Sequence, residues 1–168
     1  DSYHARSQPP ESSGVPRLLV WPESVFPAAF FKNPETRQAV SRFAREHQTA
    51  ILLASVDWSG TPGNYRFQGI SVLVGPDGQV RGRYNKIFLI PFGETIPLSD
   101  WFPGLAQLLR ENIHNLSEFE AGREFTAFSL SEQLRLSAPI CFDIFAPDTI
   151  RNMTRNGSQL AVNLSNLA

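Results

Sequence analysis

The sequence has little sulfur and no excess of either charge. Its 168 residues include one cysteine, one methionine and three histidines, and 15 basic side chains nearly balance 16 acidic ones. A single cysteine excludes an internal disulfide bond and any metal site built from several thiolates, and the three histidines lack the spacing of metal ligands. The sequence therefore indicates neither a disulfide scaffold nor a metal centre.

Two further features are missing, and each excludes a class of protein. The basic residues are scattered among acidic ones, so the chain lacks the positive surface that a nucleic-acid partner requires. No run approaches the roughly 18 to 20 apolar residues of a membrane-spanning helix, and no signal peptide opens the chain, so the segment itself is expected to be soluble. It starts with Asp1 and stops directly after an apolar run, and we therefore expect it to belong to a longer protein.

Composition divides the chain into a short lead-in and one domain. Residues 1–16 are polar and rich in Ser and Pro, which disfavours regular structure and predicts a flexible lead-in. Residues 17–168 have the ordinary apolar content of a globular domain, so one core is expected.

Short apolar runs alternate with amphipathic stretches, which predicts an α/β layered fold. The run 50–56 is apolar throughout, as in a strand that is buried on both faces. Asn33 and Pro34 form a helix start, and residues 75–78 have the composition of a hairpin turn. The predicted strands are 17–21, 50–56, 69–74, 79–84, 124–130, 133–140 and 159–165, and the predicted helices begin at 34, 101 and 147.

Three residues with chemical potential follow the ends of predicted strands: Glu23, Lys86 and Cys141. Taken singly, a lone cysteine is usually an inert buried side chain, and a lone Glu or Lys usually solvates the surface. Glu23 and Lys86, however, each stand between apolar segments, where an unpaired charge is costly to desolvate, so each is expected to have a partner.

These residue types suit acyl transfer through a thioester. A carboxylate takes the thiol proton, the thiolate attacks a carbonyl carbon, and an ammonium stabilises the developing oxyanion. Cysteine suits this role because its free pKa of about 8.5 is close enough to neutrality for a nearby base to generate thiolate.

The sequence around these residues resembles the nitrilase (carbon–nitrogen hydrolase) superfamily. VWPES at 20–24 resembles the motif of the base, GRYNK at 82–86 that of the lysine, and PICFD at 139–143 that of the nucleophile. The resemblance implies that Glu23, Lys86 and Cys141 form a catalytic triad. It also implies an α-β-β-α sandwich, of which this chain is expected to be an incomplete part that lacks the first strand and helix and the C-terminal segment.

Within that superfamily the chain most resembles the apolipoprotein N-acyltransferases, through VWPES, PFGETIP at 91–97, the hairpin VLVGPDGQVRGRYNK and NLSN at 163–166. The resemblance implies a phospholipid as acyl donor and the N-terminal amine of a diacylglyceryl-cysteine lipoprotein as acceptor, without a metal or other cofactor. It further implies the bacterial inner membrane, with membrane segments outside this chain and the catalytic domain on the periplasmic side.

The same resemblance suggests supporting residues. Glu94 and Asp143 are expected to assist the triad, and Trp101 and Phe142 to contact substrate. Two departures stand out: Asp143 replaces a Glu that is common after the nucleophile, and the stretch 65–68 does not reproduce a Tyr-Asn-Ser-like run. The apolar stretches 25–31 and 101–109 are read either as lipid-facing arms or as ordinary packing against the sheet.

Two alternative functions remain open from the sequence alone. A soluble amidase of the same superfamily uses the same triad, with water as the second acceptor, because the fold does not fix the substrate. The other alternative is a catalytically inert fragment that keeps the motifs but lacks the parts that shape the site.

Overall fold

The structure, a computed structural model, describes residues 17–23, 29–61, 64–91, 93–95 and 119–166. The predicted lead-in, the helix predicted from residue 101 and Trp101 lie outside these ranges. No helix in the described part of the chain is long and apolar enough to cross a bilayer. The elements are β1 (Leu18–Trp21), α2 (Pro34–Glu46), β2 (Ala50–Thr61), β3 (Asn64–Val74), β4 (Val80–Asn85), β5 (Phe128–Ser129), β6 (Arg135–Ser137), the 3₁₀ helix η1 (Cys141–Phe145), α4 (Pro147–Arg155) and β7 (Leu160–Ala161).

A four-stranded sheet in the order β1-β2-β3-β4 forms the centre of the molecule. β1 pairs with β2 in parallel, and the helix α2 makes the crossover between them. The other two pairs are antiparallel hairpins, and the predicted turn at residues 75–78 closes the hairpin of β3 and β4. Glu23 and Lys86 therefore both follow the ends of strands in one sheet.

The apolar run of β2 contributes side chains to two hydrophobic clusters, because successive side chains of a strand point to opposite faces of the sheet. Ile51 and Leu53 pack in a cluster with Val40 and Ala44 of α2. Leu52, by contrast, packs in a second cluster that includes residues of β5, β6 and α4. The Asn33 side chain accepts a hydrogen bond from the Thr36 backbone at 3.0 Å and caps α2, as predicted.

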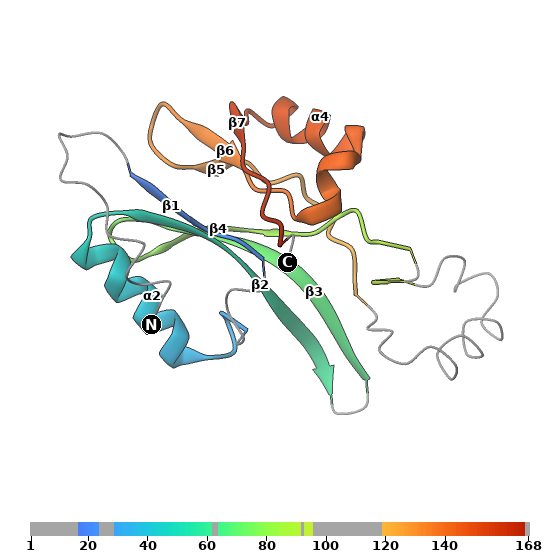
Figure 1. Ribbon diagram of the computed structural model, residues 1–168, viewed down its shortest axis with the longest axis horizontal. Coiled ribbons are helices and arrows are strands. Elements are labelled where there is room, and N and C mark those ends of the chain that lie inside the picture. Colours follow the sequence, from blue (N-terminus) through green and yellow to red (C-terminus); the bar gives the residue numbers. More distant parts are fainter. Residues whose placement is uncertain (1–16, 24–28, 62–63, 92, 96–118, 167–168) are drawn as a thin grey trace.

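The second layer consists of β5, β6 and β7, with α4 beside it. Figure 1 shows α2 on one side of the four-stranded sheet and the shorter strands with α4 on the other. The core between the layers includes Tyr84, Phe128 and Leu136, all fully buried. The predicted α-β-β-α arrangement is confirmed.

The strands of the second layer are shorter than predicted. Pro139 has no N–H to continue a ladder, and beyond β6 the pairing consists of single contacts such as the bridge between Ile140 and Leu164. Residues 124–127 form no strand, because side chains take backbone oxygens that a strand would pair with backbone N–H groups. The Asn156 side chain donates to the Phe125 oxygen at 2.7 Å, and the Thr126 hydroxyl donates to the Arg83 oxygen of β4 at 3.3 Å.

The hairpin of β2 and β3 is longer than predicted. Its pairing continues from Val56 and Gly69 to Thr61 and Asn64, through residues whose sequence is mostly polar. In Figure 1 this hairpin extends beyond the rest of the sheet. At the end of the apolar stretch 25–31, Phe30 is buried in the α2 cluster and Phe31 packs against it, which favours ordinary packing at these two residues.

Candidate functional site

Glu23 lies two residues beyond β1 and is half-buried. Burial raises the pKa of its carboxyl group, and the negative charge of Glu94 raises it further. The positive charge of Lys86 and a hydrogen bond from the Asn166 backbone act in the opposite direction. Glu23 is therefore close enough to Lys86 and Glu94 for their charges to affect its titration, and its conjugate base is stronger than that of an ordinary glutamate.

Lys86 follows β4, and its side chain is only 1% exposed. Its backbone N–H donates to the Gly69 oxygen at 2.8 Å, which continues the β3–β4 pairing by one residue. Gly69 has no side chain, and a Cβ atom built there would lie 3.4 Å from the Lys86 Cβ atom. Gly69 therefore lies in direct contact with the Lys86 side chain on this face of the sheet.

The partner of the buried Lys86 ammonium is the carboxylate of Glu94. One carboxylate oxygen, Oε1, lies 2.7 Å from the Lys86 Nζ atom. The other oxygen accepts the Ile90 N–H at 3.0 Å, and the Glu94 backbone N–H returns to the Ile90 oxygen at 2.8 Å. Because the turn fixes one oxygen through the Ile90 N–H, the carboxylate is held in place, and its other oxygen orients the ammonium.

Cys141 opens η1 in a strained backbone conformation. Its φ angle is +50°, in the left-handed region that a non-glycine residue rarely adopts and that costs on the order of 1–3 kcal/mol. Its N–H donates to the Leu164 oxygen at 3.0 Å, which anchors the turn to the segment after β7. The cysteine is partly exposed, is not in a disulfide bond, and packs against the core cluster that contains Tyr84 and Leu136.

Asp143 joins the turn that contains Cys141 to the segment at the end of β4 that contains Lys86. Its fully buried carboxylate accepts hydrogen bonds from the Tyr84 hydroxyl at 2.8 Å, the Phe88 N–H at 2.8 Å and the Ile140 N–H at 3.0 Å. The Tyr84 oxygen in turn accepts the Ile87 N–H at 3.2 Å. These bonds tie the residue before Cys141 to residues on both sides of Lys86.

The electrostatics of this link are dominated by burial. Desolvation raises the pKa of the Asp143 carboxyl group, against the opposing effects of its three hydrogen bonds and of the Lys86 charge. Burial and the neighbouring Asp143 carboxylate likewise raise the pKa of Tyr84 well above its ordinary value. The Tyr84 hydroxyl therefore keeps its proton and donates it to the hydrogen bond with Asp143.

The structure thus assembles Glu23, Lys86 and Glu94 as one charged cluster and links the Cys141 turn to the same end of β4 through Asp143. Phe142, predicted to contact substrate, is 46% exposed. The catalytic and substrate-binding roles of these residues remain predictions. In the described part of the chain, no group of three or more His, Cys, Asp or Glu side chains could hold a metal ion.

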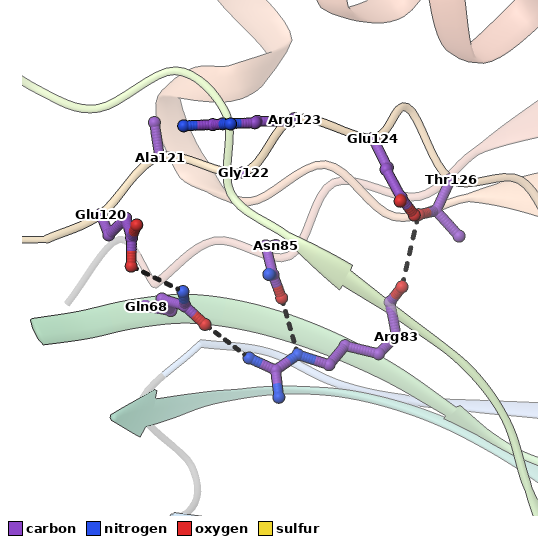
Figure 2. A pocket seen from close by; sticks show the side chains of 9 residues that line it. All are labelled: Gln68, Arg83, Asn85, Glu120, Ala121, Gly122, Arg123, Glu124 and Thr126. Atoms are coloured by element: carbon purple, nitrogen blue, oxygen red, sulfur yellow. Dashed lines mark hydrogen bonds between the residues drawn. The ribbon is translucent and has the colours of Figure 1, made fainter. Parts of the chain in front are cut away.

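A second polar cluster, which the sequence reasoning missed, lies on the other face of the same strand. Arg83 donates to Asp57 at 2.5 Å, to Asn85 at 2.6 Å and to Gln68 at 2.7 Å, and Gln68 donates to Glu120 at 3.1 Å. Figure 2 shows Arg83, Asn85, Gln68 and Glu120 around a cavity of about 460 Å³. The alternation of β4 was the available signal, because Arg83 and Asn85 must face away from Tyr84 and Lys86.

The cavity is separated from the charged cluster by the sheet itself. Gly122 lines it and donates its N–H to the Lys86 oxygen at 2.8 Å. A Cβ atom at Gly122 would collide with the Asn85 carbonyl group, so only glycine allows the chain to cross β4 this closely. We therefore assign the candidate active site to the face that carries Lys86 and not to this cavity.

Comparison with known proteins agrees with this fold and identifies the family. The family model described as carbon-nitrogen hydrolase matches residues 13–168. The chain is 30% identical over 164 residues to an apolipoprotein N-acyltransferase of Geobacter metallireducens, covering 98% of this chain and 30% of that protein. It is 25% identical to the corresponding protein of Chlorobaculum tepidum, covering 89% and 31%. The chain therefore spans about a third of the length of these curated relatives.

Solved structures show the same fold at lower identity. An amidase from Nesterenkonia sp. AN1 superposes with a TM-score of 0.62 at 18% identity, over 90% of this chain and 54% of the amidase. A carbon-nitrogen hydrolase from Helicobacter pylori G27 gives a TM-score of 0.61 at 18% identity, over 89% and 47%. With the family model matching nearly the whole sequence, the chain belongs to the carbon–nitrogen hydrolase family, as the nitrilase-like motifs indicated.

Proposed function

We propose that this chain carries the catalytic centre of an apolipoprotein N-acyltransferase, which moves an acyl chain from a phospholipid to the N-terminal amine of a diacylglyceryl-cysteine lipoprotein. The observation that carries the proposal is the buried Lys86–Glu94 pair beside Glu23, linked through Asp143 to the strained turn at Cys141. The choice of acyltransferase within the family rests on the similarity to the curated relatives over nearly the whole chain.

The first half-reaction transfers the acyl group to the enzyme. Glu23 takes the proton of the Cys141 thiol, and the sulfur attacks the ester carbonyl carbon of the phospholipid. The carbonyl oxygen becomes an oxyanion, which the Lys86 ammonium stabilises. When the tetrahedral intermediate collapses, the C–O bond breaks, Glu23 returns the proton to the leaving alkoxide, and a lysophospholipid departs from the Cys141 thioester.

The second half-reaction transfers the acyl group to the lipoprotein. The acceptor amine attacks the thioester carbonyl carbon, Glu23 accepts a proton from the amine, and Lys86 again stabilises the oxyanion. Collapse breaks the C–S bond, and the thiolate recovers its proton from Glu23. The raised pKa of Glu23 favours this shuttle, since a stronger conjugate base takes a proton more readily.

Glu94 and Asp143 act here through other residues. Glu94 keeps the Lys86 ammonium pointed at one position, and Asp143 holds the nucleophile turn against β4. We further propose that residues 17–168 form part of the catalytic domain and that the whole protein acts at the bacterial inner membrane, with this domain on the periplasmic side.

The proposal is tested by following the mass of Cys141. The protein is incubated with phosphatidylethanolamine vesicles, and we expect Cys141 to gain the mass of one acyl group. A peptide that begins with diacylglyceryl-cysteine should then remove the adduct and gain the same mass. Cys141→Ser should form no thioester while keeping its fold, because the hydroxyl is nearly the same size as the thiol but far harder to deprotonate. An unreactive Cys141 in the wild type would instead support a catalytically inert chain.

An amidase remains the second candidate, because the solved structures that share the fold include an amidase. That protein is described with acrylamide added to its active-site cysteine. In the adduct experiment, an amidase would release the acyl group to water as fast without the peptide as with it. Faster release with the peptide, and recovery of the acyl group on its amine, would decide for the acyltransferase.

A further inference from the structure

The 3₁₀ helix η1 presents three different sides because residues three apart eclipse one another in such a helix. Asp143 points into the core and is fully buried. Phe142 and Phe145 share a second side, with ring centroids 5.5 Å apart, and Ile144 lies on the third. The side chains next to the nucleophile on its own helix are therefore all apolar, apart from the buried aspartate.

These apolar side chains face solvent instead of the core. Phe145 is 73% exposed, Phe142 46% and Ile144 41%. Phe88 is 41% exposed, and its backbone lies against η1 because its N–H donates to the Asp143 carboxylate at 2.8 Å. We call Phe88, Phe142, Ile144 and Phe145 the apolar ridge. Four large apolar side chains exposed around one turn are more than the scattered single residues of an ordinary surface.

The ridge ends abruptly where α4 begins. Asp148 and Arg151 form an exposed ion pair in the first turns of α4, so charged side chains border the ridge on that side. The ridge itself carries no exposed charge. A polar headgroup would find no hydrogen-bonding side chain on it, whereas a hydrocarbon chain would find exposed apolar side chains to contact.

We propose that the apolar ridge binds the acyl chain of the lipid substrate, next to the point where its carbonyl carbon meets Cys141. This inference rests on the proposed function. The carbonyl carbon that Cys141 attacks is bonded directly to the first methylene of the chain, so the hydrocarbon must leave the sulfur across neighbouring surface. Cys141 opens η1 directly before these residues, and the tilted rings of Phe142 and Phe145 lie 5.5 Å apart, so exposed apolar side chains form the surface that follows the nucleophile along the chain.

The inference is tested by comparing two acyl donors in wild type and in Phe145→Ser. One donor is vesicular palmitoyl-oleoyl-phosphatidylethanolamine, and the other is the water-soluble ester p-nitrophenyl acetate. The rate at which Cys141 gains each acyl group is read by mass spectrometry. We expect Phe145→Ser to lower the ratio of long-chain to short-chain acylation about tenfold, because burying a phenyl ring contributes a factor of that order.

Leu160→Ser is the matched control. Leu160 lies on β7 and is 45% exposed, so the substitution removes a large exposed apolar side chain outside the ridge. We expect the long-chain to short-chain ratio to stay within about twofold of the wild type, while thermal unfolding confirms that both variants fold. A second ridge variant, Ile144→Ser, should lower the ratio in the same direction as Phe145→Ser.

Each other outcome overturns the inference in a distinguishable way. An unchanged ratio in both ridge variants, or equal losses with both donors, would show that the ridge does not contact the chain. Wild-type dimers that Phe145→Ser converts to monomers in sedimentation, with an unchanged ratio, would assign the ridge to a second copy of the protein. If neither donor acylates wild-type Cys141, the proposed function itself fails and the inference with it.

Discussion

Charged side chains on the two faces of strand β4 and its end lie in different surroundings. Lys86 and Tyr84 point between the two sheets, where each is fully buried and has a specific partner, Glu94 or Asp143. Arg83 and Asn85 point to the other side, where they line a cavity that Arg83 shares with several polar neighbours. One strand thus supplies a candidate reactive ammonium on one face and a structural polar network on the other.

The comparison separates chemistry from stability. Substitutions on the Lys86 face should change the acylation of Cys141, whereas substitutions on the Arg83 face should change the free energy of unfolding. The predictions that follow run from the largest expected effect to the smallest.

Lys86→Met should cause the largest loss. Without the ammonium, the oxyanion at the Cys141 centre loses its charged partner, and we expect acylation to slow by at least about 10³-fold. Rapid quenching followed by mass spectrometry of Cys141 measures this rate. Arg83→Met, which removes a cation from the opposite face of β4, should leave the rate within about threefold; equal losses in the two variants would abolish the distinction between the faces.

Asp143→Asn should lower the free energy of unfolding by about 2–3 kcal/mol. The carboxylate accepts three hydrogen bonds, whereas an amide has one acceptor oxygen, so at least one buried donor loses its partner. Chemical denaturation at neutral pH measures the change. Asp148→Asn, at an exposed position on α4, should change it by less than about 0.5 kcal/mol. If Asp143→Asn lowered stability as little as this control does, Asp143 would not be the link between the Cys141 turn and the end of β4.

The same carboxyl group makes stability depend on pH in a predictable direction. Its pKa is raised in the folded state, so its contribution is fully present below the unfolded pKa and is lost as the pH rises through the folded pKa. The stability advantage of wild type over Asp143→Asn should therefore be larger in mild acid than at neutral pH. An advantage that grew with pH would contradict the raised pKa.

Arg83→Met should lower the free energy of unfolding by about 1–2 kcal/mol, since three partners of a partly buried guanidinium lose a hydrogen bond. Arg81→Met is the matched control on the same strand, because Arg81 forms an exposed ion pair with Asp77, which should contribute less than about 0.5 kcal/mol. Equal effects in denaturant titrations would show that the Arg83 network stabilises the sheet no more than a surface ion pair does.

Glu94→Gln should shift the acid side of the pH profile of acylation to lower pH. Glu23 must be deprotonated to act as base, so the rate should rise with pH through its raised pKa. Removing the negative charge at position 94 lowers that pKa, because the repulsion disappears and Lys86 is left to attract Glu23. Glu120→Gln, beside the cavity on the other face, should leave the profile in place. A shift to higher pH would contradict the assigned coupling.

The sequence predicted the positions of the charged groups better than their surroundings. Glu23 and Lys86 could be placed because short apolar runs mark the strands that they follow. The left-handed conformation of Cys141 depends on hydrogen bonds from distant segments and leaves no local signal. Aspartate is usually exposed, so the sequence does not show that Asp143 is buried. Only the fold brings its partners Tyr84 and Phe88 to it.

Strand boundaries show the same limit. Pro139 was visible in the sequence as a residue without an N–H, yet the apolar pattern around it continues and predicted a longer strand. β2, by contrast, is longer than predicted, because its pairing with β3 continues through residues that are mostly polar. Pairing between segments decided both boundaries, and single-segment patterns do not contain it.

The most direct test of the account is an experimental structure of the protein with its acyl group trapped on cysteine, prepared with phospholipid in the absence of an amine acceptor. The account predicts a thioester at Cys141 whose carbonyl oxygen lies about 3 Å from the Lys86 Nζ atom, with the Glu23 carboxylate facing the same carbon. A thioester oxygen remote from Lys86, or an acyl group on another residue, would contradict it.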